Sequence, residues 1–130
     1  MNRRMAFLAV PALLAGCATW STPWSEVTGE RFNLAIADRR QVEIVSVGGR
    51  TSWWSNDQPL KVEPGLRQRI VVASLGHAGF AGGRQEEILV DLEPCKRYYI
   101  NAQFDNRISP RFEPVVDAVQ GIAGCGTRKD

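Results

Sequence analysis

His77 is the single histidine of the chain and the residue best suited to acid–base chemistry. It lies in a glycine-rich stretch, residues 75–84, between two segments with the composition of strands. A hydrolase or small-ligand site here would need a carboxylate or a serine hydroxyl within hydrogen-bond reach of the imidazole. The stretch lacks the Gly-Lys-Ser/Thr ending of a phosphate-binding loop, and the chain has no Gly-x-Ser-x-Gly element. We therefore expect a long hairpin loop here and assign no catalytic residue.

Other residue types that perform catalysis or bind metals are poorly placed. Glu86 and Glu87 are adjacent in a segment with strand character, so their carboxylates are expected on opposite faces and cannot form an acid–base pair. A zinc site would require more imidazole ligands than one histidine supplies. We expect no metal, no cofactor and no enzymatic activity.

Aromatic and polar side chains offer a candidate binding surface instead. Trp53 and Trp54 point in opposite directions in an extended chain, so one is expected in the core and the other exposed. An exposed tryptophan can stack on a sugar or anchor a protein partner, or it can simply pack under a loop. Alternation over residues 97–104 places a polar row on an outward face, which is either a binding strip or the solvated side of a sheet. The candidate binding residues are Trp53, Trp54, Arg97, Tyr99 and Asn101, with Gln103 in the same row.

These side chains must be positioned by strands. Between Arg97 and Phe104, apolar residues alternate with polar ones, which is the pattern of a half-buried strand. Residues 87–93 alternate in the same way, and Glu93-Pro94-Cys95 suits a turn between two neighbouring strands. Residues 66–73 form another expected strand after the turn signal Glu63-Pro64-Gly65, with Leu66, Ile70 and Val72 inward.

The remaining segments complete an all-β pattern. Residues 42–47 and 50–55 are expected to form a hairpin around Gly48-Gly49, and residues 111–119 the last strand. Residues 26–38 suit either a short helix or an opening strand. Strands at intervals of about ten residues, without a long helix, predict a small antiparallel β-sandwich of the immunoglobulin or transthyretin type.

The N-terminus has the features of an export signal. Arg3 and Arg4 precede an apolar run, residues 5–15, that is too short for the ~20 residues of a membrane-spanning helix. The run ends in Leu14-Ala15-Gly16-Cys17, which resembles the lipobox of bacterial lipoproteins. The resemblance implies cleavage before Cys17 and acylation of Cys17, for instance with palmitate. It also implies sorting to the outer membrane, facing the periplasm, because Ala18 rather than aspartate follows the cysteine.

Cleavage before Cys17 changes the charge and the cysteine count. The chain has 16 basic and 14 acidic residues, so loss of Arg3 and Arg4 leaves a neutral protein without a surface for nucleic acid. With Cys17 lipidated, Cys95 and Cys125 remain. In an exported domain, such a pair predicts one disulfide, whereas a redox pair would favour Cys-x-x-Cys spacing.

The expected domain organisation follows from these features. Residues 1–16 form the signal peptide, residues 17–30 the lipidated cysteine and a flexible Ser/Thr/Pro-rich tether, and residues 31–130 a single β-sandwich domain. Trp20 and Trp24 in the tether suit either the membrane interface or packing on the domain.

Two further resemblances concern the domain itself. Residues 92–104 (LEPCKRYYINAQF) and 110–125 (PRFEPVVDAVQGIAGC) resemble small uncharacterised lipoproteins of Gram-negative bacteria. Residues 62–72 (VEPGLRQRIVV) resemble the proline-glycine and strand element of PEGA-type and carboxypeptidase-regulatory-type modules. Both imply a β-sandwich outside the cytoplasm, and neither supplies a catalytic residue.

Two functions are consistent with the sequence. The first is a non-enzymatic binding or scaffolding lipoprotein whose partner is an envelope protein or peptidoglycan; it predicts an exposed apolar or aromatic patch. The second is a small-ligand binder or hydrolase at the glycine-rich loop; it predicts a pocket in which His77 meets a carboxylate or a hydroxyl. We favour the first function.

Overall fold

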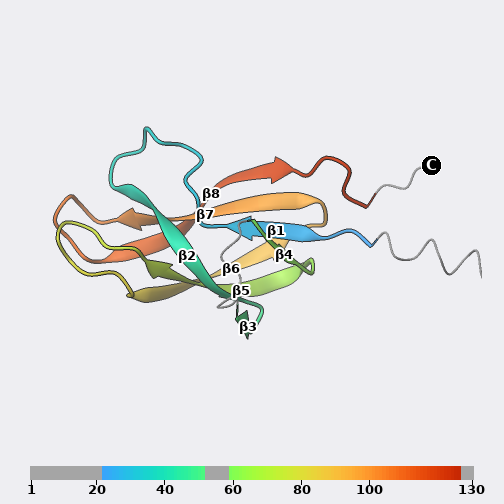
Figure 1. Ribbon diagram of the computed structural model, residues 1–130, viewed down its shortest axis with the longest axis horizontal. Coiled ribbons are helices and arrows are strands. Elements are labelled where there is room, and N and C mark those ends of the chain that lie inside the picture. Colours follow the sequence, from blue (N-terminus) through green and yellow to red (C-terminus); the bar gives the residue numbers. More distant parts are fainter. Residues whose placement is uncertain (1–21, 52–58, 127–130) are drawn as a thin grey trace, which may run out of the picture.

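The computed structural model describes residues 22–51 and 59–126 and confirms the small all-β fold (Figure 1). No helix occurs in these residues, and hence none that is long and apolar enough to cross a membrane. The eight strands are β1 (Ser25–Thr28), β2 (Arg39–Val47), β3 (Arg50–Thr51), β4 (Leu60–Val62), β5 (Gly65–Ser74), β6 (Gln85–Leu92), β7 (Lys96–Phe104) and β8 (Phe112–Gly121).

Strand β2 connects two groups of strands around one core. Its first residues, 39–41, pair with β7, which also carries β1 and β8, while β4 pairs with β1. Residues 42–47 of β2 pair with β5, and β5 pairs with β6. A bulge between Ile44 and Ser46 bends β2, and Figure 1 shows the strand running obliquely from one group to the other. The enclosed core contains Val27, Val42, Ile44, Val47, Ile70, Val72, Val90, Leu92, Tyr98, Ile100, Ala102, Phe104 and Phe112.

Strand β7 is paired along both edges. Strand β8 follows one edge from residue 96 to residue 104, while β1 and β2 share the other edge, at residues 97–99 and 101–103. The four apolar residues of the predicted alternation, Tyr98, Ile100, Ala102 and Phe104, are all buried as expected. One pair departs from the antiparallel expectation, because β1 runs parallel to β7.

The predicted tether is too long. All four residues of β1 are buried, because the strand lies between β4 and β7. The Ser25 hydroxyl donates a hydrogen bond to the Glu93 carbonyl (2.8 Å). Trp24 also packs on the domain, since its indole donates to Glu26 and the Lys61 ammonium lies 4.4 Å from its ring centroid. The ordered domain therefore begins before residue 30. Of the two alternatives for residues 26–38, a short helix or an opening strand, the structure contains the strand. Trp20 lies outside the described residues.

The turn of the predicted Gly48-Gly49 hairpin is confirmed; of its second arm, residues 50–55, the structure describes Arg50 and Thr51, which form β3. Val47 pairs with Arg50, and both glycines have positive φ angles, 60° and 87°. A two-residue type I′ turn requires positive φ at both central positions, which glycine adopts without steric cost.

The inward orientation predicted for Leu66 is wrong. Leu66 is 79% exposed, whereas Ile70 and Val72 are fully buried as expected. A register shift between Gly65 and Gln68 adds one residue to β5 opposite β6, and Arg67 there has a φ of 50°. Such a bulge reverses the alternation of side chains before it relative to those after it.

The disulfide between Cys95 and Cys125 is confirmed, with a Cα–Cα distance of 5.4 Å. It joins the turn between β6 and β7 to the segment that follows β8. Nearby backbone bonds add to this connection: Cys95 N–H donates to the Trp24 carbonyl and Ile122 N–H to that of Cys95. The entry into β1 and the C-terminal segment are thus held at the same end of the molecule.

We expect the double substitution Cys95→Ala, Cys125→Ala to lower the free energy of unfolding by about 3 to 4 kcal/mol, because the bond restricts the unfolded chain. Urea unfolding measured by tryptophan fluorescence tests this value. Reduction of the wild-type protein should give the same loss, and reductant should leave the variant unchanged. Equal midpoints for the oxidised wild type and the variant would contradict the stabilising role.

Candidate functional site

Asn101 does not belong to an exposed binding strip, because its side chain is fully buried. Its Nδ2 donates to the carbonyls of Gly29 (3.3 Å) and Glu30 (2.9 Å), while its Oδ1 has no partner among the described residues. The chain that leaves β1 covers this part of β7. The alternation of residues 97–104 predicted correctly that Asn101 faces away from the core. It did not predict that the chain leaving β1 covers this residue.

Arg97 belongs to a row of charged and polar side chains across four strands. Lys61 is opposite Glu26, Glu26 is opposite Arg97, and Arg97 is opposite Gln120. Arg97 Nε donates to Glu26 Oε1 (2.8 Å), and the Trp24 indole donates to Glu26 Oε2 (2.9 Å). Both oxygens of the carboxylate are therefore occupied within the protein.

The environment of this pair shifts both ionisable groups toward their charged forms. Burial raises the pKa of Glu26. Hydrogen bonds from Trp24 and Arg97, together with the charges of Arg97 and Lys61, outweigh burial and hold this pKa below its ordinary value of 4.5. The hydrogen bond with Tyr99, followed by that with Glu26, raises the pKa of Arg97. Both shifts arise from hydrogen bonds and charges among Trp24, Glu26, Lys61, Arg97 and Tyr99.

Tyr99 is also engaged within the molecule. Its hydroxyl donates to Gln120 Oε1 (3.0 Å), and its ring centroid lies 5.0 Å from that of Phe32. Phe32 belongs to the connection between β1 and β2, which extends along the outer face of β7 and β8. Tyr99 and Asn101, on the outer face of β7, therefore bind this connection to the sheet.

Asp117 also attaches the connection to the sheet, and no sequence motif pointed to this residue. Its buried carboxylate accepts hydrogen bonds from the backbone N–H groups of Phe32 (3.2 Å) and Asn33 (3.0 Å), and it forms an ion pair with Arg39. A bulge in β8 opposite Tyr99 and Ile100 places Asp117 in this position.

His77 has a structural environment. The residue is 8% exposed, and its ring stacks on Phe104 with centroids 4.0 Å apart. Its Nε2 lies 3.0 Å from the Asn106 carbonyl oxygen, which can only accept, so this nitrogen carries the proton. The imidazole therefore joins the loop after β5 to the loop after β7. Among the described residues, the imidazole forms no hydrogen bond with the carboxylate or hydroxyl that the hydrolase hypothesis required.

Three other predicted residues, Cys17, Trp53 and Trp54, lie outside the described residues. Within residues 22–51 and 59–126, no group of three His, Cys, Asp or Glu side chains is arranged to hold a metal ion.

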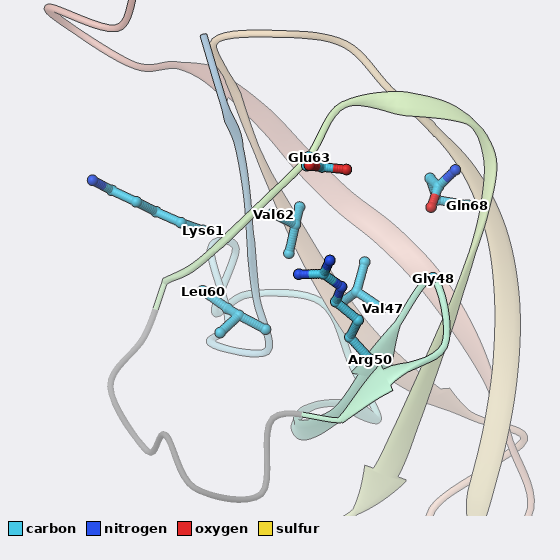
Figure 2. Close-up of a pocket in the computed structure, with 8 residues that line it drawn as sticks. All are labelled: Val47, Gly48, Arg50, Leu60, Lys61, Val62, Glu63 and Gln68. Carbon is cyan, nitrogen blue, oxygen red and sulfur yellow. The ribbon is translucent and has the colours of Figure 1, made fainter. Parts of the chain in front are cut away.

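A cavity of about 300 Å³ lies between the β2–β3 hairpin, β4 and the start of β5 (Figure 2). Its apolar surface comes from Val47, Leu60 and Val62. Its polar groups belong to Arg50, Lys61, Glu63 and Gln68, and Gly48 completes the lining. These residues come from separate stretches of the chain, and none of them had a motif that could have identified the cavity from the sequence.

Charged groups of both signs line this cavity. Figure 2 shows the Arg50 side chain extending from the hairpin toward Val62, with Glu63 above it and Lys61 directed away. Within the part of the chain that the structure describes, neither Arg50 nor Glu63 takes part in an ion pair. By contrast, Lys61 lies over the Trp24 ring. Both side chains are exposed, so Arg50 and Glu63 can reach a molecule bound in the cavity.

No protein-family model, curated protein or solved structure matches this chain. Its function must therefore be inferred from its own residues.

We expect Glu26→Gln to lower the free energy of unfolding at neutral pH by about 1 to 2 kcal/mol, because charge-assisted hydrogen bonds are lost. The lowered pKa of Glu26 means that its ionised form stabilises the fold above pH 4.5, and that this contribution is lost as the pH falls through the folded-state pKa. The difference between variant and wild type should therefore shrink in acid.

Urea unfolding at neutral pH and at about pH 3 measures this difference. The matched control is Glu113→Gln, which changes an exposed carboxylate outside the row. A Glu26→Gln effect that is the same at both pH values would show that the carboxylate charge does not stabilise the fold.

Proposed function

We propose that this chain is an outer-membrane-anchored periplasmic lipoprotein and that its domain is a non-enzymatic binding or scaffolding module of the cell envelope. The observation that carries the proposal is Leu14-Ala15-Gly16-Cys17 at the end of a short apolar run preceded by Arg3 and Arg4. Lipid on Cys17 would anchor the domain with more than one acyl chain, as stable membrane attachment requires.

The disulfide supports an exported location. The Cys95–Cys125 bond closes a loop across a sequence separation of 30 residues. Such structural disulfides persist in the periplasm and are rare in the cytosol. The third cysteine, Cys17, is then available for the lipid.

The position of β1 defines how far the domain could extend from the membrane. Trp24 is packed on the domain and β1 begins at Ser25, so the chain from Cys17 to Ser25 reaches at most about 30 Å. Pro23 approaches Gly126 near the disulfide, so this end of the molecule would face the lipid headgroups. The loops at the other end, on the left in Figure 1, would face away from the membrane.

Those distal loops carry exposed apolar side chains. Leu75 and Phe80 lie in the β5–β6 loop and Ile108 in the β7–β8 loop, and all three are exposed. The bond between His77 and Asn106 holds the two loops together. Exposed apolar groups on neighbouring loops are a feature of protein-interaction surfaces, which supports a binding role at this end.

We expect Cys17→Ser to abolish lipid attachment and to release the protein from the membrane fraction. Mass spectrometry of the purified wild type should find Cys17 as the first residue, with the added mass of its acyl chains. The matched variant Ala18→Asp keeps Cys17 and should move the protein to the inner-membrane fraction. An unmodified Cys17 in membrane-derived wild type would refute the anchor.

We expect photo-crosslinkers placed at Phe80 or Ile108 to join the protein in living cells to an envelope component, identified by mass spectrometry and by reciprocal crosslinking from that component. The control position is Ala123, which is exposed near the disulfide end. Products that are the same from Ala123, or no envelope component from either loop, would contradict a binding surface at the distal end.

A further inference from the structure

We propose that the cavity beside the β2–β3 hairpin binds a small zwitterion, either an amino acid or the end of a short peptide. Arg50 would hold the carboxylate, Glu63 the ammonium group, and the apolar residues of the cavity the side chain. The inference goes beyond the scaffolding role and does not depend on the lipid anchor.

Arg50 supplies the positive charge of the site. Its side chain lines the cavity, remains exposed to solvent and has no ion pair with any described residue (Figure 2). A guanidinium presents parallel N–H donors whose spacing matches the two oxygens of a carboxylate. The type I′ turn at Gly48-Gly49 fixes the hairpin from which Arg50 projects.

The charge balance favours a carboxylate over a phosphate. Lys61 also lines the cavity, but Figure 2 shows its side chain directed away, and its ammonium lies over the Trp24 ring. Arg50 is therefore the cation left to bind a ligand among the lining residues, and Glu63 supplies a negative charge to the same lining. A dianionic phosphate would be repelled by Glu63, whereas an ammonium group next to a carboxylate would satisfy both charges.

Gln68 provides a second acceptor on a wall that is already formed. Its Nε2 donates to the Leu66 carbonyl (3.3 Å), which leaves Oε1 available to a ligand ammonium. A Cβ at Gly48 would lie 2.6 Å from Gln68 Oε1, and a Cβ at Gly65 would lie 2.6 Å from Nε2. The two glycines thus allow the amide to pack closely between them.

The size and surface of the cavity define the ligand class. A volume of about 300 Å³ is at the lower limit of ligand pockets and suits one amino acid or a dipeptide end rather than a glycan chain. Val47, Leu60 and Val62 would contact an aliphatic side chain. Leucine and alanyl-leucine combine these properties and are therefore suitable probes.

The test is a titration of the ¹⁵N-labelled full chain in detergent micelles, followed by NMR. We expect millimolar leucine or alanyl-leucine to shift the amide signals of Gly48 and Gly65. N-acetyl-leucine lacks the ammonium group and leucinamide lacks the carboxylate, so each should bind about tenfold more weakly than leucine. Inorganic phosphate should also bind more weakly than leucine.

Two variants assign the charges. Arg50→Gln should remove the preference for leucine over leucinamide, and Glu63→Gln should remove the preference over N-acetyl-leucine. Arg107→Gln and Glu113→Gln make the same charge changes at exposed positions outside the cavity and should alter neither preference. The spectra also report whether each variant is folded.

The proposal fails if neither leucine nor alanyl-leucine shifts these signals, if phosphate binds more tightly, or if the folded Arg50→Gln variant keeps the wild-type preference. A failure of the crosslinking experiment at Phe80 and Ile108 would not affect this proposal, because neither residue lines the cavity.

Discussion

The structure depends on a single constraint, which is that strand β7 is covered on both faces and paired on both edges. Its inner face supplies Tyr98, Ile100, Ala102 and Phe104 to the core. Its outer face includes the buried Asn101, whose amide donates to carbonyls of the chain that leaves β1. Removing that amide would break both of these hydrogen bonds, although the Gly29 carbonyl would keep the one it accepts from Val42 N–H. The β1–β2 connection is therefore part of the fold rather than a tether.

This constraint determines where a ligand or partner could bind. Arg97 and Tyr99 are occupied by Glu26 and Gln120, so the outer face of β7 offers few free polar groups. Side chains without a partner among the described residues lie outside this face of β7. Arg50 and Glu63 border the cavity next to the hairpin, and apolar loop residues are exposed at the distal end. Charged side chains that are paired with one another, as in the row across β4, β1, β7 and β8, stabilise the sheet. A charged side chain that lines a cavity without such a partner can bind a ligand.

The disulfide and the start of β1 give the domain two distinct ends. Trp24, Cys95 and Cys125 are connected by backbone bonds and the disulfide, so the entry and the C-terminal segment are fixed together. If Cys17 carries lipid, the short segment before Ser25 would keep this end beside the membrane. The loops joined by His77 and Asn106 would then be the part of the domain most accessible to other envelope components.

The sequence alone determined the features that depend on neighbouring residues. Alternation between Arg97 and Phe104 predicted which side chains of β7 enter the core, because successive residues of a strand point to opposite faces. Gly48-Gly49 predicted the hairpin because its turn requires positive φ angles. The pairing of Cys95 with Cys125 followed once Cys17 was assigned to lipid.

Only the tertiary structure decided what covers each face of a strand and where a bulge reverses the alternation of its side chains. The bulge beside Arg67 turned Leu66 outward, and the chain that leaves β1 covered Asn101. The cavity could not be predicted either, since its lining brings Arg50 of β3 together with Gln68 of β5 and with Glu63, which lies between β4 and β5. Burial of an outer face, bulges and cavities arise from contacts between distant segments, whereas the period of a strand is a local property of the backbone.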